Sequence, residues 1–259
     1  MTAPATGGLP IVDELLRDRA TVLTRIERGH DLPTLARVLL AIVAIGAAMF
    51  GVAVGSYRGG VQIGFAALKV PLVMIITAAV CAPTLTAVSR ALGRPASLTR
   101  DLALLMTALA VGALVLLALA PVVLAARAAD LDYHHSILLA SACAAVAAGS
   151  AAAVLWRGVR GRGPRGARTA IAVLALVFAA VGAQVSWTLR PFLVRPQTEQ
   201  VPFIRDIDGS LYDALHRSAR SAAGLYDPPA PSWWTHLRTA AGVAPADERA
   251  PATTDATAP

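Results

Sequence analysis

Charged side chains are scarce in this sequence. Only 15% of its 259 residues are Asp, Glu, Lys or Arg, whereas 56% are hydrophobic. Soluble domains carry about 25% charged residues, so this balance argues against a soluble globular protein and favours a membrane protein. Lysine occurs once, at Lys69, and the net charge of +7 therefore comes mainly from arginine. Because these arginines lie between apolar stretches, membrane topology explains them better than nucleic-acid binding, and we predict no nucleic-acid partner.

Residues that carry catalytic or redox chemistry are also few. The two cysteines, Cys81 and Cys143, lie inside apolar stretches, so neither can form a disulfide in an extramembrane domain. No Ser-His-Asp, Cys-His or HExxH arrangement is present, and no glycine-rich phosphate loop follows a strand. The sequence therefore predicts a protein that is not an enzyme and needs no cofactor.

What the sequence does contain is five long apolar stretches without a single Asp, Glu, Lys, Arg or His. They span residues 38–57, 70–89, 102–126, 136–156 and 169–189. A helix of about 20 apolar residues rises about 30 Å, which matches the hydrocarbon core of a bilayer. We therefore predict an all-α fold, a polytopic bundle of five transmembrane helices. The absence of ionisable groups within the spans disfavours an ion-coupled transporter.

The loops between these spans predict the orientation of the chain. Cytoplasmic loops carry the excess of Lys and Arg, and the connection from Arg157 to Arg168 holds five arginines and no acidic residue. The Arg90–Asp101 connection and the N-terminal segment 1–37 are basic by the same criterion. We predict a cell inner-membrane protein with a cytoplasmic N-terminus and a periplasmic or extracellular C-terminus.

An alternative topology depends on the prolines. The third span is split at Pro121 in this interpretation, or the second span is re-entrant, and the C-terminus then lies inside. Membrane helices tolerate proline because neighbouring groups satisfy the freed carbonyl. We therefore expect Pro71, Pro83 and Pro121 to kink their helices without breaking them.

The N-terminal segment contains an amphipathic stretch, which we predict to be one helix over residues 10–29. Its apolar residues fall within an arc of about 140° at helical spacing, with charged residues opposite. One interpretation is a docking helix for a cytoplasmic protein. The favoured interpretation is a helix that lies on the inner leaflet or packs on its own bundle.

The outer connections offer few candidate functional residues. From Val61 the chain is expected to extend the second span as a helix, which places Lys69 near the membrane boundary with its ammonium reaching the headgroups. Asp130 and Asp132 lie with His134 and His135 in the other outer loop, the one group that resembles metal ligands. Adjacent histidines rarely converge on one point, so we interpret this group as a polar loop and predict no metal.

Beyond the fifth span, residues 190–241 are predicted to form an external tail with a short helix over 210–223. From residue 242 to 259 the composition is Ala, Pro, Thr and Asp, which cannot bury a core and indicates disorder.

Polar and aromatic residues mark the point where the fifth span meets this tail. Gln184 lies one turn before Trp187 and can form a hydrogen bond to another helix. After Arg190, Pro191 prevents continuation of the helix.

We expect these residues to hold the tail on the bundle. In this hypothesis Trp187 and Phe192 anchor in the membrane interface. Arg190 contacts a lipid phosphate or the carboxylate of Asp130 or Asp132. Small-residue motifs at Gly51–Gly55 and Gly60–Gly64 would add tight helix packing or a homo-oligomer.

Two stretches resemble a group of uncharacterised bacterial multi-span membrane proteins. The first covers residues 69–93, with the motifs Lys-Val-Pro and Cys-Ala-Pro. The second is the Trp-Thr-Leu-Arg-Pro-Phe motif of Trp187–Phe192, followed by Phe203–Arg205 and Gly209–Tyr212. The five-span layout also resembles the Yip1-like membrane proteins. The resemblance implies a polytopic membrane fold and brings no activity with it.

We therefore predict a non-enzymatic inner-membrane protein that anchors or organises a larger assembly. Its contacts would be the lipid bilayer and proteins bound by the N-terminal helix, the Arg157–Arg168 loop and the tail. The alternative is an oligomeric channel or an uncoupled transporter for a small solute or lipid.

Overall fold

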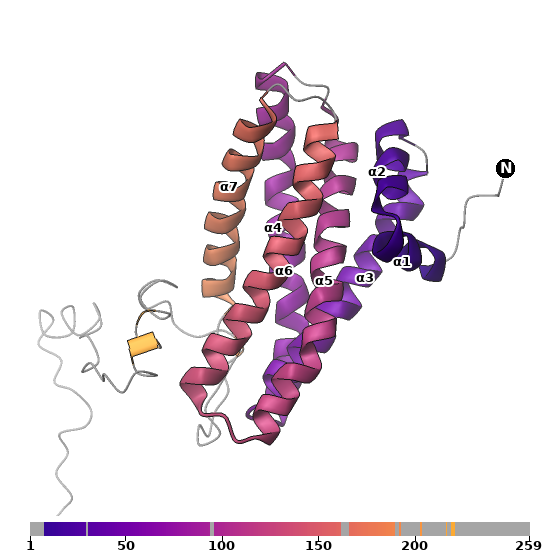
Figure 1. The fold of residues 1–259 in the computed structure, drawn as a ribbon. Helices are drawn as coiled ribbons and strands as arrows, with labels where there is room; N and C mark the ends of the chain where they lie inside the picture. Colours follow the sequence, from indigo (N-terminus) through magenta and orange to yellow (C-terminus); the bar gives the residue numbers. More distant parts are fainter. Residues whose placement is uncertain are drawn as a thin grey trace, which may run out of the picture.

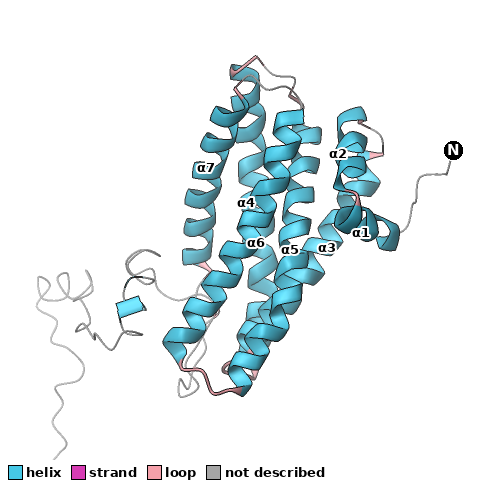
Figure 2. Cartoon of the chain, in the orientation of Figure 1, coloured by secondary structure: helices cyan, strands magenta, loops and turns pink. Residues whose placement is uncertain are grey.

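The described part of the chain consists of helices joined by short connections (Figures 1 and 2). In the computed structural model it covers residues 8–29, 31–93, 96–161 and 166–189, together with Phe192, Phe203, His216, Ala219 and Arg220. The helices are α1 (Gly8–Arg17), α2 (Arg19–Arg28), α3 (Leu32–Gly55), α4 (Val61–Ala91), α5 (Leu98–Ala128), α6 (Tyr133–Gly161) and α7 (Ala167–Thr188). Most of the predicted tail, including most of the helix expected over 210–223 and all of 242–259, lies outside the described residues.

Five of these helices, α3 to α7, are long and apolar enough to cross a membrane, which confirms the predicted all-α membrane bundle. Successive helices run in opposite directions (Figure 1). Two ends of the bundle follow from this arrangement. We call the end that carries the α4–α5 and α6–α7 connections the arginine end, and the end that carries the α3–α4 and α5–α6 connections the tail end.

The prolines do not break the helices in which they lie. Pro71 and Pro83 are inside α4, and Pro121 is inside α5, each of which is one helix of 31 residues. A helix of this length rises about 46 Å, more than the roughly 30 Å of the hydrocarbon core. The interpretation with a split third span or a re-entrant second span is therefore not supported. The predicted helical extension from Val61 is confirmed.

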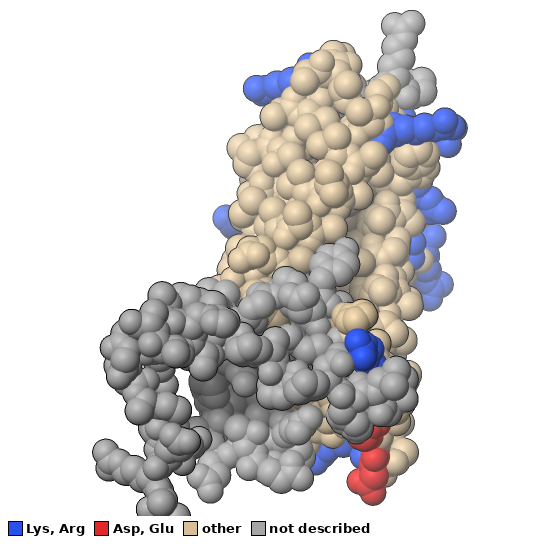
Figure 3. Space-filling model, turned by 90° about the vertical axis from the view of Figure 1, so that its left-hand side faces the viewer, with Lys and Arg blue, Asp and Glu red and all other residues tan. Residues whose placement is uncertain are grey.

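Helix α5 lies at the centre of the bundle and contacts α3, α4 and α6. In its most apolar window 67% of the residues are buried, against 11% for α7, which packs mainly on α4. The bundle is therefore a core of α3 to α6 with α7 at its edge. Figure 3 shows the side of the bundle to which α7 belongs. Most of the described surface in this view is uncharged, and the Lys and Arg side chains lie mainly near its edges.

Helices α3 and α4 approach each other closely at the Gly51–Gly55 motif. A Cβ atom at Gly51 would lie 2.4 Å from the carbonyl oxygen of Ala66, and one at Gly55 would lie 2.6 Å from that of Gln62. Only glycine fits such a crossing, as expected for small-residue packing in membranes. At Gly64 nothing described lies within 4 Å, so the second motif makes no such contact within the chain.

The N-terminal segment forms two helices, which corrects the prediction of one helix over residues 10–29. The chain leaves the helical conformation at Asp18, whose carboxylate accepts hydrogen bonds from the backbone N–H of Thr21 at 3.4 Å and from its hydroxyl at 2.6 Å. These bonds cap the start of α2. The turn allows two short apolar faces, instead of one long face, to reach the bundle.

Those two faces are buried against the chain's own core. Ile11 and Leu15 of α1 and Val22 and Ile26 of α2 are all at most 1% exposed and belong to one hydrophobic cluster with residues of α3 and α5. Burial of such side chains is worth about 1.5–3 kcal/mol each, as an upper estimate. The interpretation that this segment packs on its own bundle is confirmed.

Candidate functional site

One face of α4 holds the beginning of the tail at the tail end of the bundle. Gln62, Phe65 and Lys69 share this face, since they are spaced three and four residues apart on the helix. The amide Nε2 of Gln62 donates a hydrogen bond of 2.7 Å to the carbonyl oxygen of Phe192. The ring of Phe203 meets the ring of Phe65 edge-on, with centroids 5.0 Å apart. We call these three residues of α4 the tail-binding face.

Lys69 completes this face with a cation–π contact. Its Nζ lies 4.8 Å from the centroid of the Phe203 ring and 5.9 Å from that of Phe65. The side chain is 0% exposed. The prediction that Lys69 extends to the headgroups is therefore wrong. The physical reason is that the ammonium is attracted to the faces of two aromatic rings inside the protein. This cation–π attraction replaces the contact with lipid headgroups that the sequence predicted.

The two aromatic residues expected to anchor in the interface pack on protein instead. Trp187 is 6% exposed at the end of α7, which packs on α4. Phe192 packs on a cluster that includes Phe50 and Leu116, because Gln62 holds its backbone against the bundle. The side chain of Gln184 is exposed and forms no hydrogen bond to another helix among the described residues.

Within the described residues, Asp132 contacts the two histidines that follow it in the loop. Its carboxylate pairs with the ring of His135 and accepts a hydrogen bond of 3.2 Å from the backbone N–H of His134. Desolvation raises the pKa of Asp132, but the hydrogen bonds from His135 and His134 and the charge of His135 outweigh it and lower the pKa. Arg190 and Pro191 lie outside the described residues, so the proposed contact of Arg190 with Asp130 or Asp132 stays a prediction.

This loop does not gather metal ligands. Asp130 adopts a left-handed backbone conformation with φ of 53°, which turns the chain from α5 toward α6. Among the described residues, no group of three or more His, Cys, Asp or Glu side chains could hold a metal ion.

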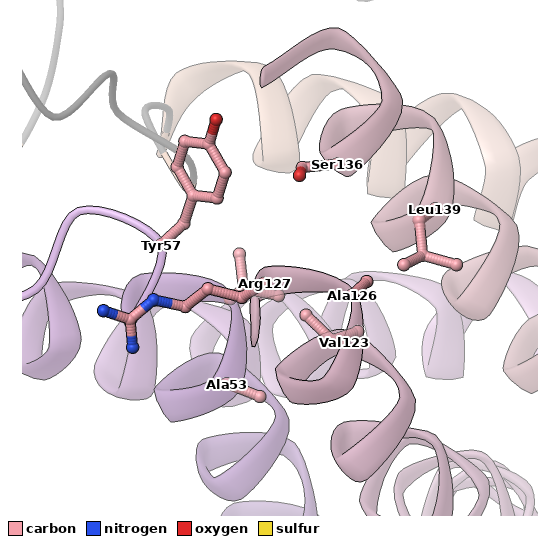
Figure 4. Close-up of a pocket in the computed structure, with 8 residues that line it drawn as sticks. Ala53, Tyr57, Val123, Ala126, Arg127, Ser136 and Leu139 are labelled. Atoms are coloured by element: carbon pink, nitrogen blue, oxygen red, sulfur yellow. The ribbon is translucent and has the colours of Figure 1, made fainter. Parts of the chain in front are cut away.

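A small cavity lies between the tail-end parts of α3, α5 and α6 (Figure 4). Tyr57, Arg127, Ser136 and Leu139 are among the residues that line it, and its volume is about 10 Å³. This is close to the minimum for one water molecule. The ring of Tyr57 and the side chain of Leu139 lie on opposite sides of the space. The cavity is too small for a substrate or cofactor.

A second buried polar contact joins α4 to α5 at the arginine end. The hydroxyl of Thr86 donates a hydrogen bond of 2.7 Å to a carboxylate oxygen of Asp101, which is 0% exposed. Asp101 lies in the first turn of α5, where the helix dipole favours a negative charge. A buried ionisable residue thus contacts another part of the chain near each end of α4: Lys69 contacts Phe203, and Asp101 of α5 accepts the hydrogen bond from Thr86.

Sequence analysis did not identify the full tail-binding face or the Thr86–Asp101 pair. A usable signal was present in the first case, because Gln62, Phe65 and Lys69 have the spacing of one helix face. For Asp101 there was none, since a carboxylate next to an apolar span is equally typical of a solvated helix start.

No protein-family model, curated protein or solved structure matches the chain. The resemblance to uncharacterised bacterial membrane proteins therefore stays a prediction. The architecture itself shows a multi-pass integral membrane protein with apolar helices suited to contact lipid.

Proposed function

We propose that this protein is a non-catalytic inner-membrane anchor that holds α1 and α2 as a fixed docking platform for a soluble assembly. The observation that carries the proposal is that these helices have a buried apolar side and an exposed charged side. Four of their apolar residues, Ile11, Leu15, Val22 and Ile26, are buried in the bundle. On the opposite side Asp13, Arg17, Glu27 and Arg28 are exposed, together with the apolar Leu16. A pair of helices that is fixed on one side and charged on the other suits polar, reversible contact with a protein partner.

The predicted orientation places this platform in the cytoplasm. The arginine end carries Arg90, Arg100, Arg157, Arg160 and Arg168, and loops rich in arginine stay on the cytoplasmic side. The predicted Arg157–Arg168 loop would add a basic border, although its first residues, up to Gly161, continue α6 as helix.

The test is affinity purification of the full chain from its native membranes in mild detergent. We expect a soluble complex to accompany the wild type and to be lost from a Glu27→Arg, Arg28→Glu variant, which keeps the net charge but reverses the pattern on α2. Arg127→Glu at the tail end is the control and should retain the complex. Equal recovery of the same proteins with all three chains would overturn the proposal.

The alternative function, an oligomeric channel or uncoupled transporter, would need a path between copies of the chain. The cavity of about 10 Å³ between α3, α5 and α6 is itself too small for a solute. Solute flux into vesicles that contain the purified protein, without any bound complex, would favour this alternative.

A further inference from the structure

An open groove lies along the outer face of α6, with Ile171 of α7 at its edge. Its lining is made by Gly149, Ala152, Ala153, Trp156, Arg157 and Arg160 of α6 and by Ile171 of α7. The six α6 residues follow the spacing of one helix face. The groove has a volume of about 940 Å³, and a Cβ atom added at Gly149 would meet nothing within 4 Å.

The groove is apolar at one end and basic at the other. Gly149, Ala152 and Ala153 form a shallow floor of small residues, whereas the exposed Arg157 and Arg160 lie at the arginine end. No acidic residue lines the groove, and neither arginine forms an ion pair with any residue that the structure describes. This end therefore carries an uncompensated positive charge of two.

The basic end is also preorganised. The guanidinium carbon of Arg160 lies 5.9 Å from the centroid of the Trp156 ring. A cation–π contact of this kind positions the guanidinium while its N–H groups remain able to donate to an anion. Trp156 itself is a residue type that favours the headgroup region.

The length of the groove matches one leaflet of a bilayer. From Gly149 to Arg160 the helix rises about 16 Å, which is half of the roughly 30 Å hydrocarbon core. A floor of small residues one leaflet long that ends in two arginines is complementary to a single lipid with an anionic headgroup. Basic pockets between transmembrane helices bind such headgroups.

We propose that this groove on α6 binds one anionic glycerophospholipid. Its phosphate contacts Arg157 and Arg160, and one acyl chain lies on Gly149, Ala152 and Ala153 against Ile171. The lipid covers the exposed face of α6 beside α7, which is the least buried span. This site is independent of the docking platform on α1 and α2.

The experiment is native mass spectrometry of the full chain in detergent, titrated with phosphatidylglycerol or with phosphatidylcholine. The wild type is expected to bind one phosphatidylglycerol more tightly than any phosphatidylcholine. Each arginine near the membrane surface contributes about fivefold, so Arg157→Gln with Arg160→Gln should weaken this first site roughly thirtyfold. The matched control, Arg37→Gln with Arg90→Gln, removes two exposed arginines of the same end that do not line the groove and should keep the site.

A second pair of variants tests the floor without a change of charge. Ala152→Leu fills the groove and should weaken the first site, whereas Ala144→Leu, exposed on another face of α6, should leave it unchanged. Equal binding of the two lipids, or an equal loss with the control arginines, would overturn the proposal. Displacement of the bound lipid by inorganic phosphate alone would identify an anion site instead. A lipid-free dimer whose formation Ala152→Leu abolishes would identify a second copy of the chain as the occupant.

Discussion

The ammonium of Lys69 lies 4.8 Å from the centre of the Phe203 ring, which joins α4 to a residue of the tail far away in the sequence. The contact is buried, and Phe65 packs edge-on against the same ring. The only lysine of the chain thus connects α4 to Phe203 inside the protein.

Replacement of this lysine should release the tail. Cation–π contacts are worth about 0.5–2 kcal/mol, so Lys69→Met should raise the rate of trypsin cleavage at the tail arginine Arg205 about two- to thirtyfold. Phe203→Ala should do the same, and Lys69→Arg should restore most of the protection. Cleavage of the purified protein in detergent measures the effect. If Lys69→Met and Phe203→Ala are cleaved at the wild-type rate, the tail is held by other contacts.

The two glycine motifs should respond oppositely to alanine. Gly51→Ala places a methyl group 2.4 Å from the carbonyl oxygen of Ala66, an overlap that should cost about 1–3 kcal/mol of stability. Gly64→Ala meets nothing and should stabilise α4 by roughly 0.5–1 kcal/mol, because it removes the entropy cost of glycine in a helix. Thermal unfolding in detergent distinguishes the two, and equal shifts would contradict the close crossing of α3 and α4.

The Thr86–Asp101 hydrogen bond should stabilise the junction of α4 and α5. Thr86→Val preserves shape but removes the donor, and hydrogen bonds to charged groups contribute about 1.5–3 kcal/mol. We expect a loss of that size in the free energy of unfolding, with Thr86→Ser largely restoring it. Thr84→Val is the control, since Thr84 lies two residues before Thr86 on α4 and the described residues show no hydrogen bond from its side chain to α5; it should change stability little. An equal loss from both valine variants would assign the effect to the helix and not to the bond.

The cap of α2 predicts a specific pH dependence. Hydrogen bonds from the hydroxyl and the backbone N–H of Thr21 lower the pKa of Asp18 below its ordinary value of 3.8. A lowered pKa in the folded state means that the cap stabilises α2 fully above this ordinary value and is lost as the pH falls through the lower, folded value. Titration of the Asp18 carboxyl by NMR in wild type and Thr21→Val measures this. The variant should titrate at a higher pH, and an unchanged curve would exclude the hydroxyl as the cause.

Sequence analysis predicted the spans because lipid imposes a simple rule. A segment such as 102–126 must be continuously apolar and helical to cross a bilayer, whatever it packs against. The same rule carried α5 correctly through Pro121. It says nothing about which helix is central, and the burial of α5 relative to α7 follows only from packing in three dimensions.

The errors lie where a local pattern has two physical solutions. The apolar residues from Ile11 to Ile26 fit one helix, but the hydrogen bonds that Asp18 accepts favour a second start. A lysine beside a span can reach the headgroups or turn inward, and Phe203 lies too far along the sequence for the local pattern to reveal the choice. Tertiary contacts between distant residues decided both cases.

The central position of α5 also determines the order in which the protein can be assembled during synthesis. Helices α3 and α4 are synthesised before α5, which both of them contact, so until then they can pack only on each other, with their closest approach at Gly51 and Gly55. The interior closes only after α5 and α6 have followed. Helix α7 is made last and packs mainly on α4, so the contacts of Phe192 and Phe203 with α4 can form only after all five spans have been synthesised.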